Sequence, residues 1–186
     1  NQLNEYFFKP IKSFHLAEGP GGFIEAINHV RGQNPRDLYY GITLIEESQN
    51  IPNWNKLQSI IDIQDNIIIE NGIDGRGDLF DPNNYNDLKG KYMGTMDLIT
   101  ADGGFDFSVN FNHQETQALR LLLTEVIYTF MLQKNGGVFI FKMFDTFKKA
   151  SIDVIYILSC FYEKINVVKP NTSRYANSEK YIVCKN

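Results

Sequence analysis

The stretch FHLAEGPGGFIEAINHV, residues 14–30, decides the fold class of this chain. It opens with a short apolar run over Phe14–Ala17, continues into the turn cluster Glu18–Gly22, and then shows apolar residues at helical spacing over 23–30. This order predicts a strand, a glycine-rich turn and a helix in direct succession. A strand followed at once by a helix is the first half of a crossover unit, from which parallel sheets are built.

The same alternation continues along the chain. Further apolar runs predict strands over 38–45, 67–69, 97–101 and 138–141, and helical spacing predicts a long helix ending near Gln133 and another over 148–159. Two final strands, 162–168 and 180–184, have no helix between them, so we expect an antiparallel hairpin at the edge of the sheet. The predicted fold is α/β, with a mostly parallel sheet, helices on both faces and this C-terminal hairpin.

Length and composition are typical of one folded domain over residues 1–186, with 43% hydrophobic and 22% charged residues. Two cysteines are too few for a disulfide scaffold or a cysteine-based zinc site, and the three histidines lack the spacing of metal ligands. Apolar runs fall short of the about 20 residues that a bilayer span needs, and no leader sequence opens the chain. We expect a soluble intracellular protein with no metal and no membrane association.

The charge is unevenly distributed. The net charge is −4, but residues 134–186 hold nine basic against four acidic residues, and residues 1–133 hold nine basic against eighteen acidic ones. The overall balance counts against a free-standing nucleic-acid binder, which is usually basic. The asymmetry permits one basic face on an acidic body, so any phosphate contacts would come from the C-terminal third, from other segments or from a partner.

Glycine and aspartate gather where the predicted parallel strands end, which is where open parallel sheets bind ligands. Glu18-Gly19-Pro20-Gly21-Gly22-Phe23 follows the first strand, and its glycines would let the backbone approach a nucleotide-like cofactor at a helix N-terminus. A tight strand-to-helix turn is the alternative, and the spacing matches neither the dinucleotide motif nor a P-loop. Asp78, after the third strand, is either a cofactor acceptor or a turn residue.

Three further polar positions lie at the same predicted edge. Asp102 follows the fourth strand and Lys142 ends the fifth, so adjacent parallel strands would bring this acid and this amine together. They form either a reactive pair or an ordinary salt bridge. The polar loop 169–179 ends in Glu179 just before the last strand, and eleven residues is longer than a solvated hairpin loop needs.

Together these residues resemble the FtsJ-like (RrmJ-like) ribose 2′-O-methyltransferases, and most of all the mRNA cap-1 branch of eukaryotes and large DNA viruses. The resemblance runs nearly the whole length of the chain. The matching segments are LAEGPGGF (16–23), GITL (41–44), GIDGRGDL (72–79), TADGGF (100–105), GGVFIFK (136–142) and KPNTSRYANSEKY (169–181).

The resemblance implies a Rossmann-like fold with S-adenosylmethionine as cofactor. Its methionine end would lie on Gly19–Phe23 and its adenine near Asp78 and Leu79, and Glu18 and Asp102 would also bind the cofactor. It also implies a Lys-Asp-Lys-Glu catalytic tetrad, of which Asp102, Lys142 and Glu179 match three members. The candidate RNA contacts are Ser173, Arg174 and Asn177.

The first lysine of the tetrad has no match. In the family it lies well upstream of the glycine-rich turn, a position that here falls before Asn1, and Lys9 and Lys12 are too close to the first strand. We therefore expect that the chain lacks an N-terminal segment of the parent protein, or else is a degenerate relative of the family. A protein partner or additional domains of the same polypeptide are also expected.

The chemistry of methyl transfer favours these residue types independently. The ribose hydroxyl must lose its proton, and a lysine can accept it only where its surroundings disfavour the ammonium form. Burial and a neighbouring sulfonium act in that direction at Lys142, and Asp102 acts against it. Glu179 would orient the amine or the ribose.

The leading hypothesis is therefore methylation of the first nucleotide of capped mRNA, in the nucleus or cytoplasm, or in a viral factory or virion if the chain is viral. Three alternatives stay open: an rRNA or tRNA ribose 2′-O-methyltransferase, a non-catalytic RNA-binding or stimulatory subunit that keeps the fold, and a purely structural domain.

Overall fold

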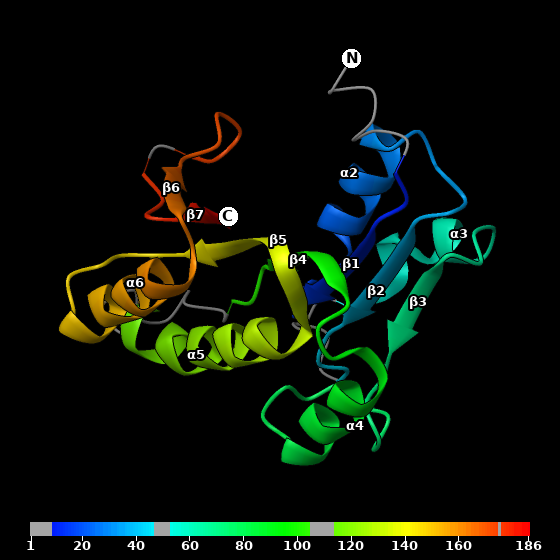
Figure 1. Cartoon of the computed structure of the whole chain (residues 1–186), viewed down its shortest axis with the longest axis horizontal. Helices are drawn as coiled ribbons and strands as arrows, with labels where there is room; N and C mark the ends of the chain where they lie inside the picture. Colours follow the sequence, from blue (N-terminus) through cyan, green and yellow to red (C-terminus); the bar gives the residue numbers. More distant parts are fainter. Residues whose placement is uncertain (1–8, 47–52, 105–113, 175) are drawn as a thin grey trace.

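The computed structural model describes residues 9–46, 53–104, 114–174 and 176–186. Its centre is a seven-stranded sheet in the order β3-β2-β1-β4-β5-β7-β6 (Figure 1). β1 to β5 run parallel, and β7 pairs antiparallel with both β5 and β6. The predicted mostly parallel sheet with a C-terminal antiparallel hairpin is confirmed. The strands are β1 (Lys12–Leu16), β2 (Leu38–Ile42), β3 (Ile67–Glu70), β4 (Met96–Ala101), β5 (Gln133–Met143), β6 (Lys164–Val168) and β7 (Lys180–Lys185).

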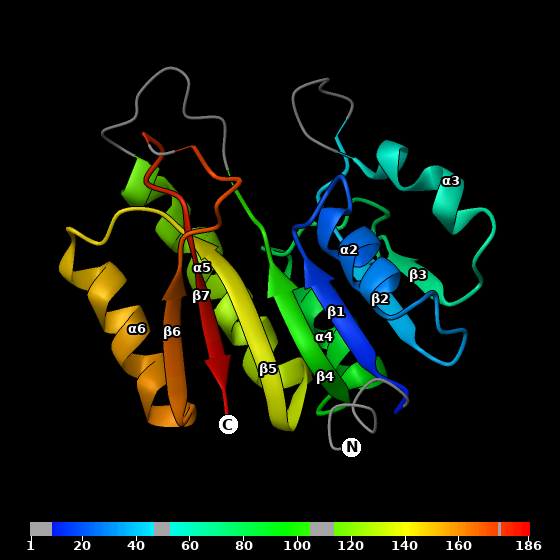
Figure 2. The same cartoon turned by 90° about the horizontal axis from the view of Figure 1, so that it is seen from above.

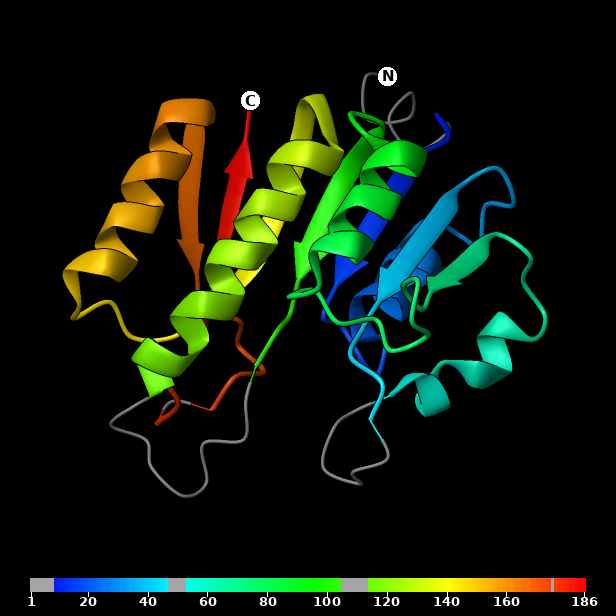
Figure 3. The ribbon, with the colours of Figure 1, turned by 90° about the horizontal axis from the view of Figure 1, so that it is seen from below.

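Helices cover both faces of the sheet, as the sequence predicts. One face carries α2 (Gly22–Val30), the short 3₁₀ turn η1 (Trp54–Lys56) and α3 (Gln58–Ile61), in front of the sheet in Figure 2. The other face carries α4 (Pro82–Tyr92), α5 (Gln114–Leu132) and α6 (Lys149–Phe161), which lie in front in Figure 3. Within the described ranges, no helix is both long and apolar enough to cross a membrane.

The central strands are buried on both faces, which explains their nearly continuous apolar sequence. Side chains of β1, β4 and β5 form the larger core with the inner faces of α5 and α6, and a smaller core lies under α2 and α3. The larger core includes Phe14, Leu16, Ile99, Phe139, Phe141, Val126 and Leu158, and the smaller one consists of Ile24, Tyr39, Trp54, Leu57 and Ile67.

Some elements differ from the sequence-based expectation. Helix α4 was not predicted, because its sequence is polar and only Leu88 and Asn84 are buried. Its start does carry a signal, since Asp81 caps the helix by accepting from the Asn83 amide and Pro82 takes the first position. β5 begins at Gln133 rather than near residue 138, so Gly136 and Gly137 lie within the strand.

Candidate active site

The carboxyl ends of β1, β4 and β5 meet the start of β7 at one edge of the sheet, the upper edge in Figure 2. Register fixes this meeting: Leu16 pairs with Ala101, Ala101 with Phe141, and Lys142 with Tyr181. Because β1 connects onward to β2 on one side while β4 flanks it on the other, the sheet reverses its strand order here. Such a switch point is where open α/β sheets bind ligands.

In the glycine-rich turn after β1, Gly21 packs against the protein and Gly22 faces open space. Gly21 has φ +100°, and a Cβ there would lie 2.7 Å from Leu57 Cδ2, so a side chain is excluded. A Cβ on Gly22 would meet nothing within 4 Å. The backbone at Gly22 is therefore open to a ligand at the N-terminus of α2.

Glu18 supports this turn from below. Its side chain is 1% exposed, and its Oε1 accepts the Phe23 amide at 2.5 Å and the Ile24 amide at 3.1 Å. These N–H groups of the first turn of α2 have no partner within the helix, so Glu18 caps the helix. The carboxylate predicted to contact the cofactor thus points into the protein and holds the turn in place.

Glu18 is itself held by a network of buried polar side chains, which the sequence analysis did not identify. His15 Nδ1 lies 2.8 Å from Glu18 Oε2, and Ser13 Oγ lies 2.8 Å from His15 Nε2. Thr100 Oγ1 donates to Glu18 Oε2 at 3.3 Å. All four side chains are buried, and they join β1 and β4 beneath the glycine-rich turn. His15 therefore has a supporting role.

The loop after β3 closes against the end of β2. Gly77 has φ +63°, and a Cβ there would lie 2.2 Å from the Thr43 carbonyl oxygen, so the backbones touch. Asp78 is half-buried and accepts the Phe80 amide at 2.8 Å, while Leu79 packs into the core. Asn84 of α4 ties the loop down through its bond to the Asp78 carbonyl at 2.9 Å.

Asp102 and Lys142 form the predicted pair. Lys142 Nζ lies 3.3 Å from Asp102 Oδ1 and donates to the Asp102 carbonyl oxygen at 2.7 Å. The lysine side chain is 14% exposed, so this pair is partly shielded from solvent. Phe105, the last residue of the motif around Asp102, lies outside the described residues.

Tyr181 also contacts the Asp102–Lys142 pair, and the sequence analysis did not identify it. Its hydroxyl donates to Asp102 Oδ1 at 3.0 Å, and its ring packs edge-on against Phe23 with centroids 5.7 Å apart. Burial and then the charge of Asp102 raise the pKa of Tyr181, so the phenol stays a hydrogen-bond donor. In the structure Tyr181 lies in β7 directly opposite Lys142, a pairing that the sequence pattern does not reveal.

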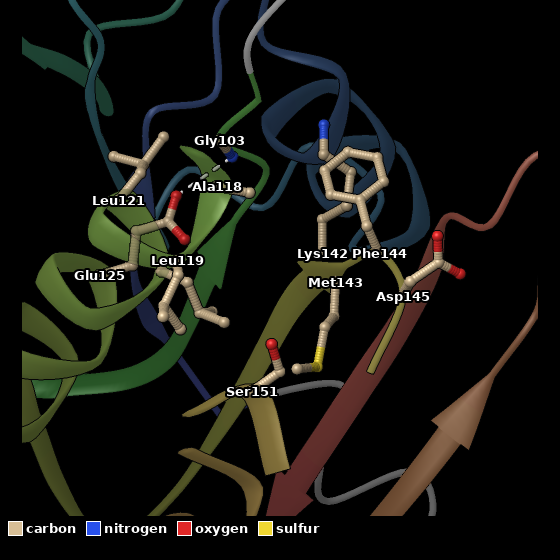
Figure 4. Close-up of a pocket in the computed structure, with 11 residues that line it drawn as sticks. Gly103, Ala118, Leu119, Leu121, Glu125, Lys142, Met143, Phe144, Asp145 and Ser151 are labelled. Carbon is tan, nitrogen blue, oxygen red and sulfur yellow. Dashed lines mark hydrogen bonds between the residues drawn. The ribbon is translucent and has the colours of Figure 1, made fainter. Parts of the chain in front are cut away.

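Glu125 of α5 is the other residue that was missed. It is 2% exposed, and its Oε1 accepts the Gly103 amide at 3.1 Å (Figure 4). It lines a small pocket together with Lys142, Phe144 and Ser151. Burial raises the pKa of Glu125 to about 8, against the opposing charge of Lys142.

The loop before β7 brings Glu179 to a neighbouring groove, which it lines with Phe23, Ser173 and Tyr181. The loop is held by its own residues, since Asn177 Oδ1 accepts the Glu179 amide at 2.9 Å and Lys169 Nζ donates to the Glu179 carbonyl at 2.6 Å. Asn177 thus positions Glu179.

The predicted RNA contacts Ser173 and Arg174 lie in this same loop. Ser173 Oγ is buried without a hydrogen-bond partner among the described residues, and Arg174 is exposed.

Lys9 and Lys12, the two lysines near the first strand, lie away from this edge of the sheet. Lys12 opens β1 and Lys9 precedes it, so both lie at the opposite end of that strand from Asp102. Within the described residues, no cluster of histidine, cysteine and acidic side chains could hold a metal ion.

The model of the FtsJ-like methyltransferase family matches residues 2–186. The chain belongs to this family. It is 34% identical over 184 residues to the mouse cap-specific mRNA (nucleoside-2′-O-)-methyltransferase 1, covering 91% of this chain and 20% of the mouse protein. It is 31% identical over 188 residues to the Drosophila melanogaster cap-specific mRNA (nucleoside-2′-O-)-methyltransferase 2, covering 95% of this chain and 27% of that protein. The domain thus spans about a quarter or less of these relatives.

Solved structures show the same fold. A protein named as a ribosomal RNA methyltransferase from Plasmodium falciparum is similar with a TM-score of 0.63 and 19% identity, over 98% of this chain and 91% of that one. Human methyltransferase-like protein 13, solved in complex with SAH, is similar with a TM-score of 0.61 and 13% identity, over 100% and 76% of the two chains. The Rossmann-like methyltransferase fold is therefore established for this domain.

Proposed function

We propose that this domain transfers a methyl group from S-adenosylmethionine to the ribose 2′-hydroxyl of RNA, at the first nucleotide of capped mRNA. The observation that carries the proposal is the Asp102–Lys142 contact at the ends of β4 and β5, beside the open backbone at Gly22. In this proposal Lys142 supplies a proton-accepting amine, and the turn at Gly22 holds the methyl donor. The cap-specific names of the mouse and Drosophila relatives support the choice of capped mRNA.

The residues present fit the cofactor. Gly19–Phe23 would hold its methionine end, with Gly22 leaving the space that a side chain would fill, and the loop with Asp78 and Leu79 would face the adenine. Glu18 contributes by capping α2. When bound, S-adenosylmethionine supplies an electrophilic methyl group on a sulfonium.

In the proposed mechanism, Lys142 Nζ would accept the proton that the ribose 2′-hydroxyl loses when it is methylated. Asp102 holds the amine through its carboxylate and its carbonyl oxygen, and the Tyr181 hydroxyl donates to the same carboxylate oxygen, Oδ1. Glu179, in the groove with Phe23 and Tyr181, would orient the ribose.

The proposal places RNA over the loop 169–179. Its candidate contacts are the exposed Arg174, the Ser173 hydroxyl, which has no hydrogen-bond partner in the part of the chain that the structure describes, and Asn177, which acts mainly through Glu179. Phosphate contacts dominate RNA affinity, and residues 1–133 are acidic. Further contacts would therefore come from other segments of the polypeptide or a protein partner, in the nucleus or cytoplasm, where mRNA is modified.

Methyl transfer to matched capped and uncapped RNAs tests the proposal. We expect the full-length protein to methylate the capped RNA at its first transcribed nucleotide at least tenfold faster than the uncapped one, a difference of about 1.4 kcal/mol in transition-state binding. Equal rates on both would favour the rRNA or tRNA alternative, and cofactor binding without transfer would favour the non-catalytic subunit.

Replacing Gly22 by leucine tests the cofactor cradle directly. The side chain would project into the open space at the N-terminus of α2, so we expect at least a tenfold loss of S-adenosylmethionine affinity by calorimetry, about 1.4 kcal/mol of binding energy. Gly90→Leu is the matched control, because Gly90 lies in α4 and its Cβ would also meet nothing within 4 Å. Unchanged affinity in Gly22→Leu would remove the turn from the cofactor site.

A further inference from the structure

Helix α5 carries a buried carboxyl group, that of Glu125, near the Asp102–Lys142 pair. Glu125 is 2% exposed, and the charges of both Lys142 and Asp102 act on it. Figure 4 shows its carboxyl reaching Gly103, the residue after Asp102, while Lys142 faces the same pocket from the β5 side. Burying an ionised carboxylate is costly unless it is paired, so this position needs an explanation.

The contact with Gly103 explains part of it. Glu125 Oε1 accepts the Gly103 amide at 3.1 Å, and a Cβ on Gly103 would lie only 2.2 Å from that oxygen. The loop that carries Asp102 thus packs closely against Glu125 and Leu121 of α5. A neutral carboxylic acid can make this hydrogen bond through its carbonyl oxygen, so the negative charge is not needed for it.

We propose that Glu125 is a positioning residue for methyl transfer, which in its neutral form holds the Asp102–Gly103 backbone against α5 and adds no second negative charge beside Lys142. The inference rests on the proposed function, because it assigns the base to Lys142. Glu125 acts through its neighbours and touches neither RNA nor cofactor in this scheme.

The surrounding charges are consistent with a neutral Glu125 near pH 7. Asp102 faces it from the end of β4 and Lys142 from β5, and Asp145 lines the same pocket after β5. On its own helix, Arg120 is exposed and lies over the Phe80 ring, 4.2 Å from its centroid. Burial outweighs the opposing charge of Lys142 and raises the pKa of Glu125 to about 8.

Ionisation of Glu125 would work against catalysis. A carboxylate beside Lys142 favours the ammonium form of the lysine, which cannot accept a proton. One pH unit above its pKa, only about a tenth of Glu125 stays neutral. The rate of the wild type should therefore fall behind that of a variant with a permanently neutral group as the pH rises above about 8.

The experiment compares the full-length wild type with Glu125→Gln and Glu125→Leu in single-turnover methyl transfer to capped RNA between pH 6.5 and 9.5. Glutamine keeps the oxygen that accepts from the Gly103 amide, so we expect Glu125→Gln to transfer methyl groups at a rate near wild type at pH 7. At pH 9 its rate should be about ten times that of the wild type. Leucine leaves the Gly103 amide unpaired, so we expect about a tenfold lower rate at pH 7 with unchanged cofactor affinity.

Thr129→Ala is the matched control, because Thr129 is buried one turn further along α5 and donates to the Glu125 carbonyl oxygen at 2.8 Å. It should lower stability and leave the shape of the pH profile unchanged. Parallel profiles for wild type and Glu125→Gln, or a Glu125→Gln variant that is slow at pH 7, would overturn the inference. Glutamine keeps the test valid if Glu125→Leu fails to fold.

A titration independent of activity separates this inference from the proposed function. NMR of the ¹³C-labelled Glu125 carboxyl should give a midpoint near pH 8, with the Gly103 amide shift following the same curve. A midpoint near 4.5 would overturn the inference even in an active enzyme. Absence of RNA methylation by the wild type would overturn the proposed function, while the titration would still decide whether Glu125 is held neutral.

Discussion

Replacing Lys142 with alanine is expected to lower the rate of methyl transfer by about 10²–10⁴-fold, the usual contribution of a positioned general base. Lys142 Nζ lies within hydrogen-bonding reach of Asp102, and in the proposed mechanism it is the group that removes the 2′-hydroxyl proton. The glycine-rich turn lies on other elements, so the affinity for S-adenosylmethionine should stay unchanged. Single-turnover rates and calorimetry on the full-length protein measure the two quantities.

Lys134→Ala is a closely matched control for this variant. Lys134 lies on the same strand, β5, and also pairs with an aspartate of β4, Asp97, but at the opposite end of the sheet. It should keep a rate near wild type. A Lys142→Ala enzyme as active as Lys134→Ala would rule out Lys142 as the base.

The second large effect concerns stability. The pKa of Glu125 is raised from 4.5 to about 8 in the folded protein, chiefly by burial, and returns to the lower value on unfolding. Between these pH values the folded state keeps a proton that the unfolded state has released, so the free energy of unfolding falls as pH rises. Glutamine does not titrate, so this fall should be absent from Glu125→Gln. Between pH 4.5 and pH 7, the free energy of unfolding of Glu125→Gln should therefore rise relative to that of the wild type by roughly 3 kcal/mol.

Urea unfolding followed by circular dichroism at several pH values measures this difference. Thr129→Ala again serves as the control, because it removes a buried hydrogen bond from the same helix without removing a titrating group. A constant difference between wild type and Glu125→Gln across this range would show that Glu125 is ionised in the folded protein.

Much of the fold and part of the site could be predicted from the sequence. Asp102 and Lys142 could be paired because each follows a recognisable strand, and the ends of neighbouring parallel strands meet. The glycine-rich turn could be found because three glycines exceed what a simple turn needs. These signals are local, and their geometry follows from regular strand pairing.

The residues that were missed depend on packing between distant elements. Glu125 lies between Leu122 and Val126 on a helix whose apolar pattern gives no reason to expect a buried acid. Tyr181 contacts Asp102 only because β7 inserts between β5 and β6, a strand order that hydrophobic periodicity does not encode. Sequence patterns also did not show that the Glu18 carboxylate accepts hydrogen bonds from the first-turn amides of α2.

The most direct test of the central claim is transfer of a labelled methyl group to two capped RNAs that differ at one atom. One carries the 2′-hydroxyl on the first transcribed nucleotide, and the other carries 2′-deoxyribose there. If the domain acts on the ribose 2′-oxygen, the full-length protein should label only the first RNA, and digestion should release the label as a 2′-O-methylnucleoside. Equal labelling of both RNAs, or label on a base, would contradict the account.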